Sequence, residues 1–340
     1  MRNGVRILLS FLFIVEAAIL SNAAQGMDRE VVIYTSVDQV FSEPILNAFE
    51  KARGIKVRAV YDVEASKTVG LVNRLIAEKD RPKCDVFWNN EFARTIALKQ
   101  KGILTPYRSP SAQDIPQAFR DKEDQWTGFS ARARVLIYNR QLVKEQDLPR
   151  SIFELTDPRW KGKVALAYPL FGTTATQMAA LYVALGKEET EAYLTDLNAN
   201  KVVIVNGNSV ARDVVVEGQY PVGFTDSDDV NVALQSGKPV GMILPDDKGL
   251  GTLLIPNTIA MIKNCPHPEE GRELVDYLLS HDVERQLAFS EAAQIPVRAG
   301  VERPSNVLDI QSITFMKVDY EAVAQKVDEA GRFCQKLFVR

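Results

Sequence analysis

Short strand-like runs alternate with helix-like segments along most of this chain, and this alternation constrains the fold more than any other feature. In the first third, β-branched and apolar runs lie at 31–35, 57–61 and 85–88. In the middle third, further runs of this kind lie at 134–139, 163–168, 201–205 and 221–224. Most of the segments between them carry apolar residues on one helical face and end at glycine. The alternation predicts an α/β fold in which helices cover both faces of a mixed, mostly parallel sheet.

The strand–helix alternation occurs in two blocks, and no long Gly/Ser-rich or Pro-rich linker separates them. The 340 residues are 46% hydrophobic, which is enough apolar material for two sizeable cores. Two lobes without a flexible linker indicate a chain that crosses between them more than once. The net charge of -3 is mild and argues against nucleic acid as a partner.

Residues 1–24 have the composition of a secretory signal peptide. Two arginines precede an apolar run over residues 7–20, and small residues follow the run. The run is too short for a good transmembrane span, and the alternative is an uncleaved N-terminal anchor. We expect the mature chain to begin near Ala24 or Gln25 and the protein to be exported.

The stretch VGFTDSDDV concentrates negative charge where a strand ends and a helix begins. Asp226, Asp228 and Asp229 occupy three of four consecutive positions. Carboxylates this close repel one another unless a cation lies among them, and their oxygens suit a hard metal ion or a ligand ammonium group. The alternative is helix capping, because an Asp at the N-cap and further acidic residues in the first turn stabilise a helix.

Two other helix starts carry groups that suit an anion. The motif LFGTTATQ places Gly172, Thr173 and Thr174 where a helix begins, and NGNS places Asn208 and Ser209 at the next one. Backbone N–H groups and hydroxyls at such a terminus can hold a carboxylate, a carbonate or a phosphonate. The alternative is that both motifs are ordinary N-caps.

The segment SARARV carries polar side chains at every second position. Ser130, Arg132 and Arg134 would therefore share one face of a strand. An arginine there would clamp a ligand acid group through two hydrogen bonds. The alternative is an ion pair at a hinge.

Together these motifs resemble those of the type II periplasmic solute-binding proteins of ABC importers, in the branch that includes the ferric-iron binders. The similarity covers nearly all of the chain after the signal peptide. It rests on VVIYTSVDQ, FEKARGIKV, CDVFWNNE, TGFSARARVLIYN, DPRWKGKVALA, NGNSVARDVV, VGFTDSDD and SEAAQIPVR. It implies two α/β lobes joined by crossing strands, with the ligand in the cleft between them. One lobe would comprise residues 28–128 and 252–305, the other 129–251, and the helices of 306–340 would pack on the lobes.

The resemblance also implies which residues face the ligand. Iron-binding members hold ferric iron with a His after the first strand, a Glu after the third and two adjacent Tyr after a later strand. The matching positions here are Asp38, Glu91, Ser227 and Asp228, so the tyrosine pair is absent. Asp38, Glu91 and Asp228 are the candidate metal ligands. The candidate ligand-binding residues are Ser36, Asp38, Glu91, Ser130, Arg132, Gly172, Thr173, Thr174, Asn208, Ser209, Asp226, Ser227 and Asp228.

These residues predict a cargo that is a metal ion, such as ferric iron, with a companion anion. The alternative cargo is a small zwitterion such as an aminoalkylphosphonate or an amino acid. The resemblance implies a monomeric periplasmic protein that requires no cofactor and delivers its cargo to an ABC permease in the inner membrane. A periplasmic sensor partner is a second alternative. An enzyme is disfavoured, because neither His267 nor His281 lies in a metal-binding or triad spacing.

Three cysteines are few for an exported chain, so disulfides do not carry the fold. The resemblance places Cys84 just before the third strand and Cys265 just after an antiparallel neighbour, at one edge away from the cleft. A disulfide between them, with Cys334 left over, is one expectation in an oxidising compartment. An odd number of cysteines leaves at least one unpaired within the monomer.

Overall fold

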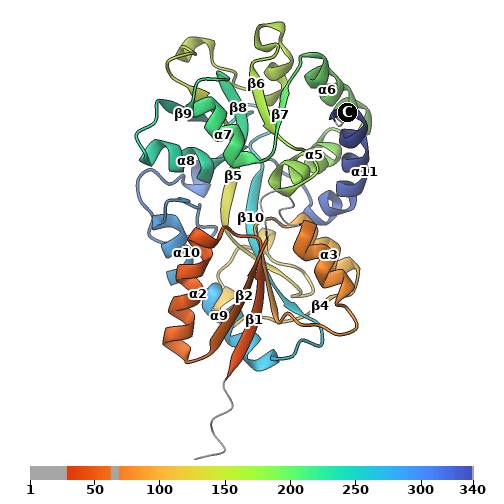
Figure 1. The fold of residues 1–340 in the computed structure, drawn as a ribbon, viewed down its shortest axis with the longest axis vertical. Helices are drawn as coiled ribbons and strands as arrows, with labels where there is room; N and C mark the ends of the chain where they lie inside the picture. The colour runs from red at the N-terminus through yellow and green to blue at the C-terminus, as the bar shows by residue number, and fades with distance from the viewer. Residues whose placement is uncertain (1–28, 63–68, 339–340) are drawn as a thin grey trace, which may run out of the picture.

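The computed structural model describes residues 29–62 and 69–338, and the predicted signal peptide over residues 1–24 lies outside them. Figure 1 shows two α/β lobes, one above the other, joined by the strands β5 (Thr127–Asn139) and β10 (Leu254–Ile262). The two-lobe α/β architecture predicted from the sequence is therefore confirmed. Within the described residues, no helix is both long enough and apolar enough to cross a membrane.

The lower lobe in Figure 1 contains the first three strands predicted from the sequence. Its parallel strands are β1 (Glu30–Thr35), β2 (Lys56–Tyr61) and β3 (Val86–Asn89). Strand β10 runs antiparallel beside β3 and also pairs with the short β4 (Leu104–Thr105). The helices of this lobe are α2 (Gln39–Arg53), α3 (Val69–Ala77), α4 (Ala93–Gln100), α9 (Pro268–Leu278) and α10 (His281–Phe289).

The upper lobe repeats the strand–helix alternation. Its parallel strands are β6 (Val164–Ala167), β7 (Val203–Val205) and β8 (Val222–Asp226). Each strand leads into a helix, and these helices are α5 (Gly172–Ala184), α7 (Asn208–Val216) and α8 (Ser227–Gln235). Helix α6 (Lys187–Ala199) follows α5. Strand β9 (Val240–Ile243), which the sequence did not predict, runs antiparallel to β5.

The two crossing strands carry one continuous sheet through both lobes. The first half of β5 pairs with β10, and its second half pairs with β8 and β9. The pairing shifts register between Pro256 and Asn257, opposite Ser130, whose φ of 42° is left-handed. A bulge of this kind re-aims side chains along the strand. The predicted alternation along SARARV therefore breaks at Ser130.

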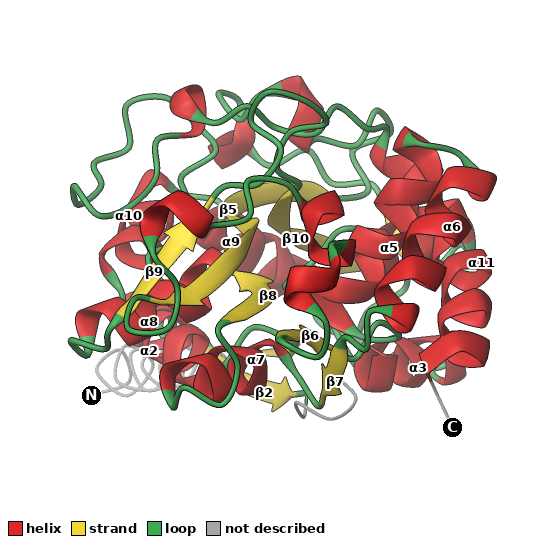
Figure 2. Ribbon diagram, turned by 90° about the horizontal axis from the view of Figure 1, so that it is seen from above, coloured by secondary structure: helices red, strands yellow, loops and turns green. Residues whose placement is uncertain are grey.

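Apolar side chains pack on both faces of this sheet rather than in one core per lobe. Along β5, Val135 and Ile137 belong to one buried cluster and Leu136 to the other, and each cluster draws residues from both lobes. Helix α11 (Tyr320–Phe338) contacts α4 of the lower lobe and α5 and α6 of the upper one. Figure 2 shows α11 beside α5 and α6. The predicted residue boundaries of the lobes remain predictions.

The three cysteines are free thiols. The antiparallel register, with Val86 opposite Met261, brings Cys84 and Cys265 to the same edge of the lower lobe, but no disulfide joins them. Cys84 is buried and donates to the Val86 carbonyl over 3.1 Å. Burial raises the pKa of Cys265 to about 11. The Cys84–Cys265 disulfide that was one expectation is therefore not formed in this structure.

Candidate functional site

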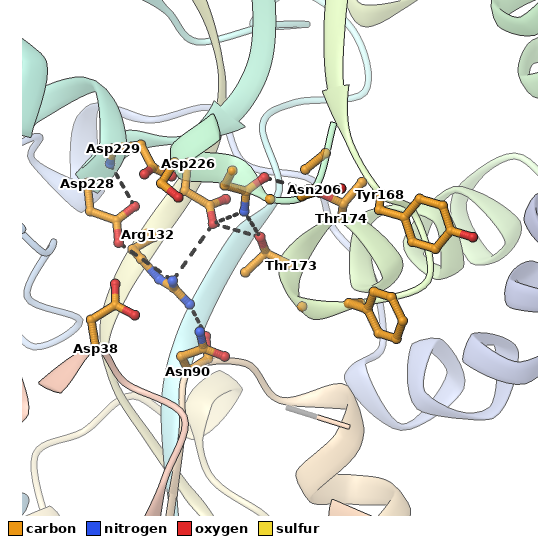
Figure 3. A pocket seen from close by; sticks show the side chains of 16 residues that line it. Asp38, Asn90, Arg132, Tyr168, Thr173, Thr174, Asn206, Asp226, Asp228 and Asp229 are labelled. Atoms are coloured by element: carbon orange, nitrogen blue, oxygen red, sulfur yellow. Dashed lines mark hydrogen bonds and ion pairs between the residues drawn. The ribbon is translucent and has the colours of Figure 1, made fainter. Parts of the chain in front are cut away.

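The candidate site lies between the lobes, where three helices of the upper lobe begin. Because β6, β7 and β8 are parallel, their carboxyl ends meet at one edge and bring the N-termini of α5, α7 and α8 together. Figure 3 shows these helix starts across Arg132 of β5 from Asp38 and Asn90 of the lower lobe. Both lobes and a crossing strand thus line the cleft.

Most of the predicted site residues do line this cleft. They are Asp38, Arg132, Gly172, Thr173, Thr174, Asn208, Ser209, Asp226 and Asp228. They divide the cleft into an acidic side, at the start of α8 and at Asp38, and a side rich in hydroxyl, amide and backbone N–H groups, at the starts of α5 and α7.

Asp226 is the centre of a buried network on the acidic side. Its Oδ1 accepts a 2.7 Å hydrogen bond from the fully buried Arg134. Its Oδ2 accepts hydrogen bonds from Thr173 Oγ1 at 2.6 Å and from Asn208 Nδ2 at 2.9 Å. Burial would raise the pKa of Asp226, but the guanidinium groups of Arg134 and Arg132 hold it below its usual value. Asp226 is therefore ionised and already paired.

This network decides two of the alternatives that the sequence left open. The Asp226 side chain does not cap α8, so the capping interpretation is wrong for this residue. Arg134 makes an ion pair instead of facing an open site, so the ion-pair alternative is confirmed for it.

Arg132 is the guanidinium that lines the cleft. Its Nη1 lies 3.6 Å from Asp228 and 3.8 Å from Asp226, and its Nη2 donates to the Asn90 carbonyl. Asp38 faces it from the lower lobe (Figure 3). The Nε of Arg132 is buried and has no hydrogen-bond partner among the described residues. A guanidinium held in this way retains donors for a carboxylate or a phosphonate.

Asp228 and Asp229 complete the acidic side in the first turn of α8. In the described part of the chain, one oxygen from each of Asp226, Asp228 and Asp229 lies within 4.8 Å of the others. Asp229 accepts a 2.9 Å hydrogen bond from Thr225 and lies 3.6 Å from Arg212. Burial and the charges of Asp228 and Asp226 raise the pKa of Asp229 well above its usual value. The carboxylates of Asp228 and Asp226 thus disfavour a charge on Asp229 more strongly than Arg212 favours it.

The opposite side of the cleft offers donors. The N-cap residues of α5 and α7, Phe171 and Gly207, supply no side-chain cap to their helices. Neither helix therefore receives a capping hydrogen bond from the side chain of its N-cap residue. Gly172 has a φ of 53°, and a Cβ at this position would meet nothing within 4 Å. The ordinary N-cap alternative is wrong for both helices, and their termini suit an anion.

The prediction that Glu91 is a metal ligand in the cleft is wrong, because Glu91 is fully buried and does not line the cleft. Its carboxylate accepts hydrogen bonds from the N–H groups of Ala93 and Arg94, at 2.5 and 2.8 Å, and therefore caps α4. It also accepts a 3.0 Å hydrogen bond from Thr176 of α5, in the other lobe. Burial raises the pKa of Glu91. This carboxylate is occupied by the fold and does not face a ligand.

Three serines of the predicted set also lie outside the cleft. Ser36 donates to Asn89 over 2.6 Å, and Ser227 accepts the Ala133 N–H at 3.1 Å. Ser130 lies at the bulge of β5, where its buried hydroxyl has no partner among the described residues. Local hydrogen bonds and the register break, which the sequence does not show, turn these hydroxyls away.

The structure also adds lining residues that the sequence did not single out. They are Asn90, Ala167, Tyr168, Phe171, Asn206 and Gly207. Asp229 of the acidic cluster, which the sequence marks as a candidate for helix capping, lines the cleft as well. Asn90 and Asn206 directly follow strands, and that position was a usable signal. Tyr168 and Phe171 precede a helix without any charge pattern, and no signal in the sequence marked them.

A family model describes this architecture. The model for bacterial extracellular solute-binding proteins matches residues 82–325. The chain belongs to this family. Its members are solute-binding proteins rather than enzymes, and the resemblance stated from the sequence is confirmed.

Relatives of this family member carry names that refer to different solutes. The chain is 27% identical to Iron uptake protein A1 of Synechocystis sp. over 312 residues, which cover 86% of this chain and 85% of that protein. It is 28% identical to a putative 2-aminoethylphosphonate-binding periplasmic protein of Salmonella typhi over 304 residues, which cover 86% of each. The crystal structure of iron-bound HitA from Pseudomonas aeruginosa matches with a TM-score of 0.82 at 24% identity, over 92% of this chain and 100% of that one. The last match shows that the fold is shared.

Proposed function

We propose that this chain is the periplasmic solute-binding component of an ABC importer and that it carries ferric iron together with a companion anion. The observation that supports the proposal is a cleft with two chemically different sides, in which an acidic cluster lies beside two helix N-termini without side-chain caps. The name of the Synechocystis relative supports iron as the metal. Closure of the lobes would enclose the cargo before its delivery to a permease in the inner membrane.

Asp228 and Asp38 are the proposed metal ligands. Asp228 lines the cleft from the upper lobe and Asp38 from the lower lobe, so an ion between them would tie the lobes together. Carboxylate oxygens suit hard cations. Asp226 is paired with Arg134 and is therefore not proposed as a ligand. A cation beside Asp229 would lower the raised pKa of that residue.

The starts of α5 and α7 are the proposed site of the companion anion. The backbone N–H groups of Gly172, Thr173 and Thr174 would provide donors at one terminus, and Asn208 and Ser209 line the cleft at the other. Arg132 lies beside the acidic cluster and also lines the cleft. An anion held there would contact both the protein and the metal ion.

Calorimetry on metal-free protein tests this proposal. Ferric iron supplied with carbonate or phosphate should bind to the wild type. Asp228→Asn should weaken binding about thirtyfold or more, because truncating one partner of a buried charge contact costs roughly 2–5 kcal/mol. Asp38→Asn should weaken binding less, because Asp38 is exposed. Asp196→Asn, on the exposed face of α6, is the control and should bind like the wild type. A folded wild type that takes up no iron with any anion would refute iron as the cargo.

A small zwitterion such as an aminoalkylphosphonate is the second candidate, and Arg132 is the observation that favours it. A guanidinium 3.6 Å from Asp228 already supplies positive charge where a metal ion would bind, and no tyrosine pair follows β8. The acid group would then bind Arg132 and the helix termini, and the ammonium group would bind Asp228 and Asp38. The name of the Salmonella relative supports this alternative. Tight binding of 2-aminoethylphosphonate without metal, and no uptake of iron, would replace the first proposal.

A further inference from the structure

Two aromatic rings border the anion side of the cleft. Tyr168 and Phe171 lie in the loop between β6 and α5, with ring centroids 5.5 Å apart and ring planes inclined by 25°. Both line the cleft and are half-buried. Figure 3 shows Tyr168 on the same side as Thr174, far from Asp38. Neither a bare metal ion nor a small inorganic anion needs apolar rings at this position.

Among the described residues, the rings of Tyr168 and Phe171 lie outside both buried apolar clusters. Leu170, between them in sequence, packs against one of the two buried clusters, whereas neither ring is part of them. Apolar surface left open in a cleft is stabilised when carbon atoms of a ligand cover it. Phe171 also borders a groove beside α11, so Tyr168 is the more specific probe of the cleft.

The backbone places the rings directly beside the proposed anion position. Phe171 is the N-cap residue of α5, so an anion on the N–H groups of the first turn lies next to this residue. Gly172 lacks a side chain where a Cβ would meet nothing within 4 Å, which leaves room between the loop and the cleft. A substituent on the anion could therefore pass Gly172 and reach the rings.

We infer that the companion anion is organic, with its acid group at the start of α5 and its carbon body against Tyr168 and Phe171. This inference rests on the proposed function and names the class of anion that the site takes. A carboxylic acid or an organic phosphate or phosphonate with a flat or apolar body fits the arrangement. Carbonate and inorganic phosphate fill the helix terminus but leave the rings uncovered.

Three anions with the same acid chemistry test the inference. Calorimetry measures the affinity of the mature protein for inorganic phosphate, methylphosphonate and phenylphosphonate, each supplied with ferric iron. The compared quantity is the ratio of the affinity for phenylphosphonate to the affinity for phosphate. In the wild type, phenylphosphonate should bind about tenfold more tightly than phosphate, the size expected for one aromatic contact. Tyr168→Ala and Phe171→Ala should reduce this ratio to about twofold.

Two control variants test whether the aromatic rings themselves cause the preference for phenylphosphonate. Tyr168→Phe keeps the ring and removes the hydroxyl, so the ratio should stay near tenfold. Phe289→Ala removes an exposed ring at the end of α10, outside the cleft, and should not change the ratio. Melting curves confirm that each variant is folded, and Phe171→Leu replaces Phe171→Ala if the alanine variant does not fold.

The outcomes distinguish this inference from the proposed function. Equal affinity of the wild type for phosphate and phenylphosphonate, or an equal loss in Tyr168→Phe and Tyr168→Ala, would overturn the inference and leave iron carriage standing. Preferential binding of phenylphosphonate without any uptake of iron would support the ring contact and overturn iron as the cargo. Failure of every anion to bind, with or without iron, would overturn both.

Discussion

Replacing Asp226 should separate the part of the acidic cluster that supports the fold from the part that binds cargo. Its carboxylate pairs with Arg134, whose side chain is 0% exposed. Asp226→Asn keeps the size of the side chain and removes the charge that balances this arginine. Leaving a buried charge without its partner costs roughly 3–5 kcal/mol.

That cost converts into a measurable shift in melting temperature. The unfolding entropy of about 2 cal/mol/K per residue gives roughly 0.6 kcal/mol/K for a chain of this size that melts as one unit. The expected decrease for Asp226→Asn is therefore about 5–8 °C. Arg134→Gln combined with Asp226→Asn should melt higher than Asp226→Asn alone, because the double variant contains no unpaired charge.

Scanning calorimetry of metal-free protein provides the comparison. Asp228→Asn removes a carboxylate that lines the cleft and should shift the melting temperature by less than about 2 °C while losing iron affinity. If Asp226→Asn melts within about 1 °C of the wild type, or if the double variant melts no higher than the single one, the ion pair does not support the site. If Asp228→Asn melts as low as Asp226→Asn, the division of the cluster into two roles is wrong.

Three further predictions concern Asp229, Glu91 and the signal peptide. Burial and two neighbouring carboxylates raise the pKa of Asp229 above its unfolded value of 3.8, so the stability it contributes is complete below about pH 4 and is lost as the pH rises through the folded pKa. Asp229→Asn should therefore flatten the decrease in melting temperature between pH 4 and 7, and an unchanged slope would contradict this reasoning. Glu91→Ala should lower the melting temperature by about 2–5 °C, because it removes the cap of α4 and the contact to Thr176, yet iron affinity should stay within about threefold. N-terminal sequencing of exported protein should start near residue 24 or 25, and a retained Met1 in membranes would reject the signal peptide.

The strands that the sequence predicted are those with their own local signal. Runs of β-branched residues between turn-forming residues identified β1, β2, β3, β6, β7 and β8 to within a few residues. Strands β4 and β9 were missed, since β4 has two residues and β9 is a short segment stabilised by its pairing with β5. Pairing partners that are distant in sequence leave no local pattern to detect.

In the candidate site as well, the features with a local sequence signal were predicted, and those that depend on distant segments were not. The starts of α5 and α7 were predicted because a Gly/Thr or Asn/Ser motif at a helix terminus has a local meaning. The pairing of Arg134 with Asp226 was not predicted, since it depends on the antiparallel register of β5 and β8, which sets these residues opposite each other. The displacement of Ser130 likewise depends on a bulge that forms only when β5 meets β10.

The loop after β3 connects these observations, because it receives donors from two other parts of the molecule. Arg132 of β5 donates to the Asn90 carbonyl, and Thr176 of α5 donates to Glu91. The carboxylate that the resemblance assigned to the metal thus holds the loop, α4 and the upper lobe together instead.

The charged side chains of the cleft bear on the charge that the cargo can carry. Four lining aspartates, Asp38, Asp226, Asp228 and Asp229, face Arg132, and Arg134 and Arg212 stand directly beside them. These described groups are four carboxylates and three guanidinium groups. Under the proposed function, a ferric ion would add three positive charges beside them. Because an unbalanced charge in a closed cleft is costly, we expect such a cargo to include an anion, and the starts of α5 and α7, which have no side-chain cap from their N-cap residues, are the proposed place for it.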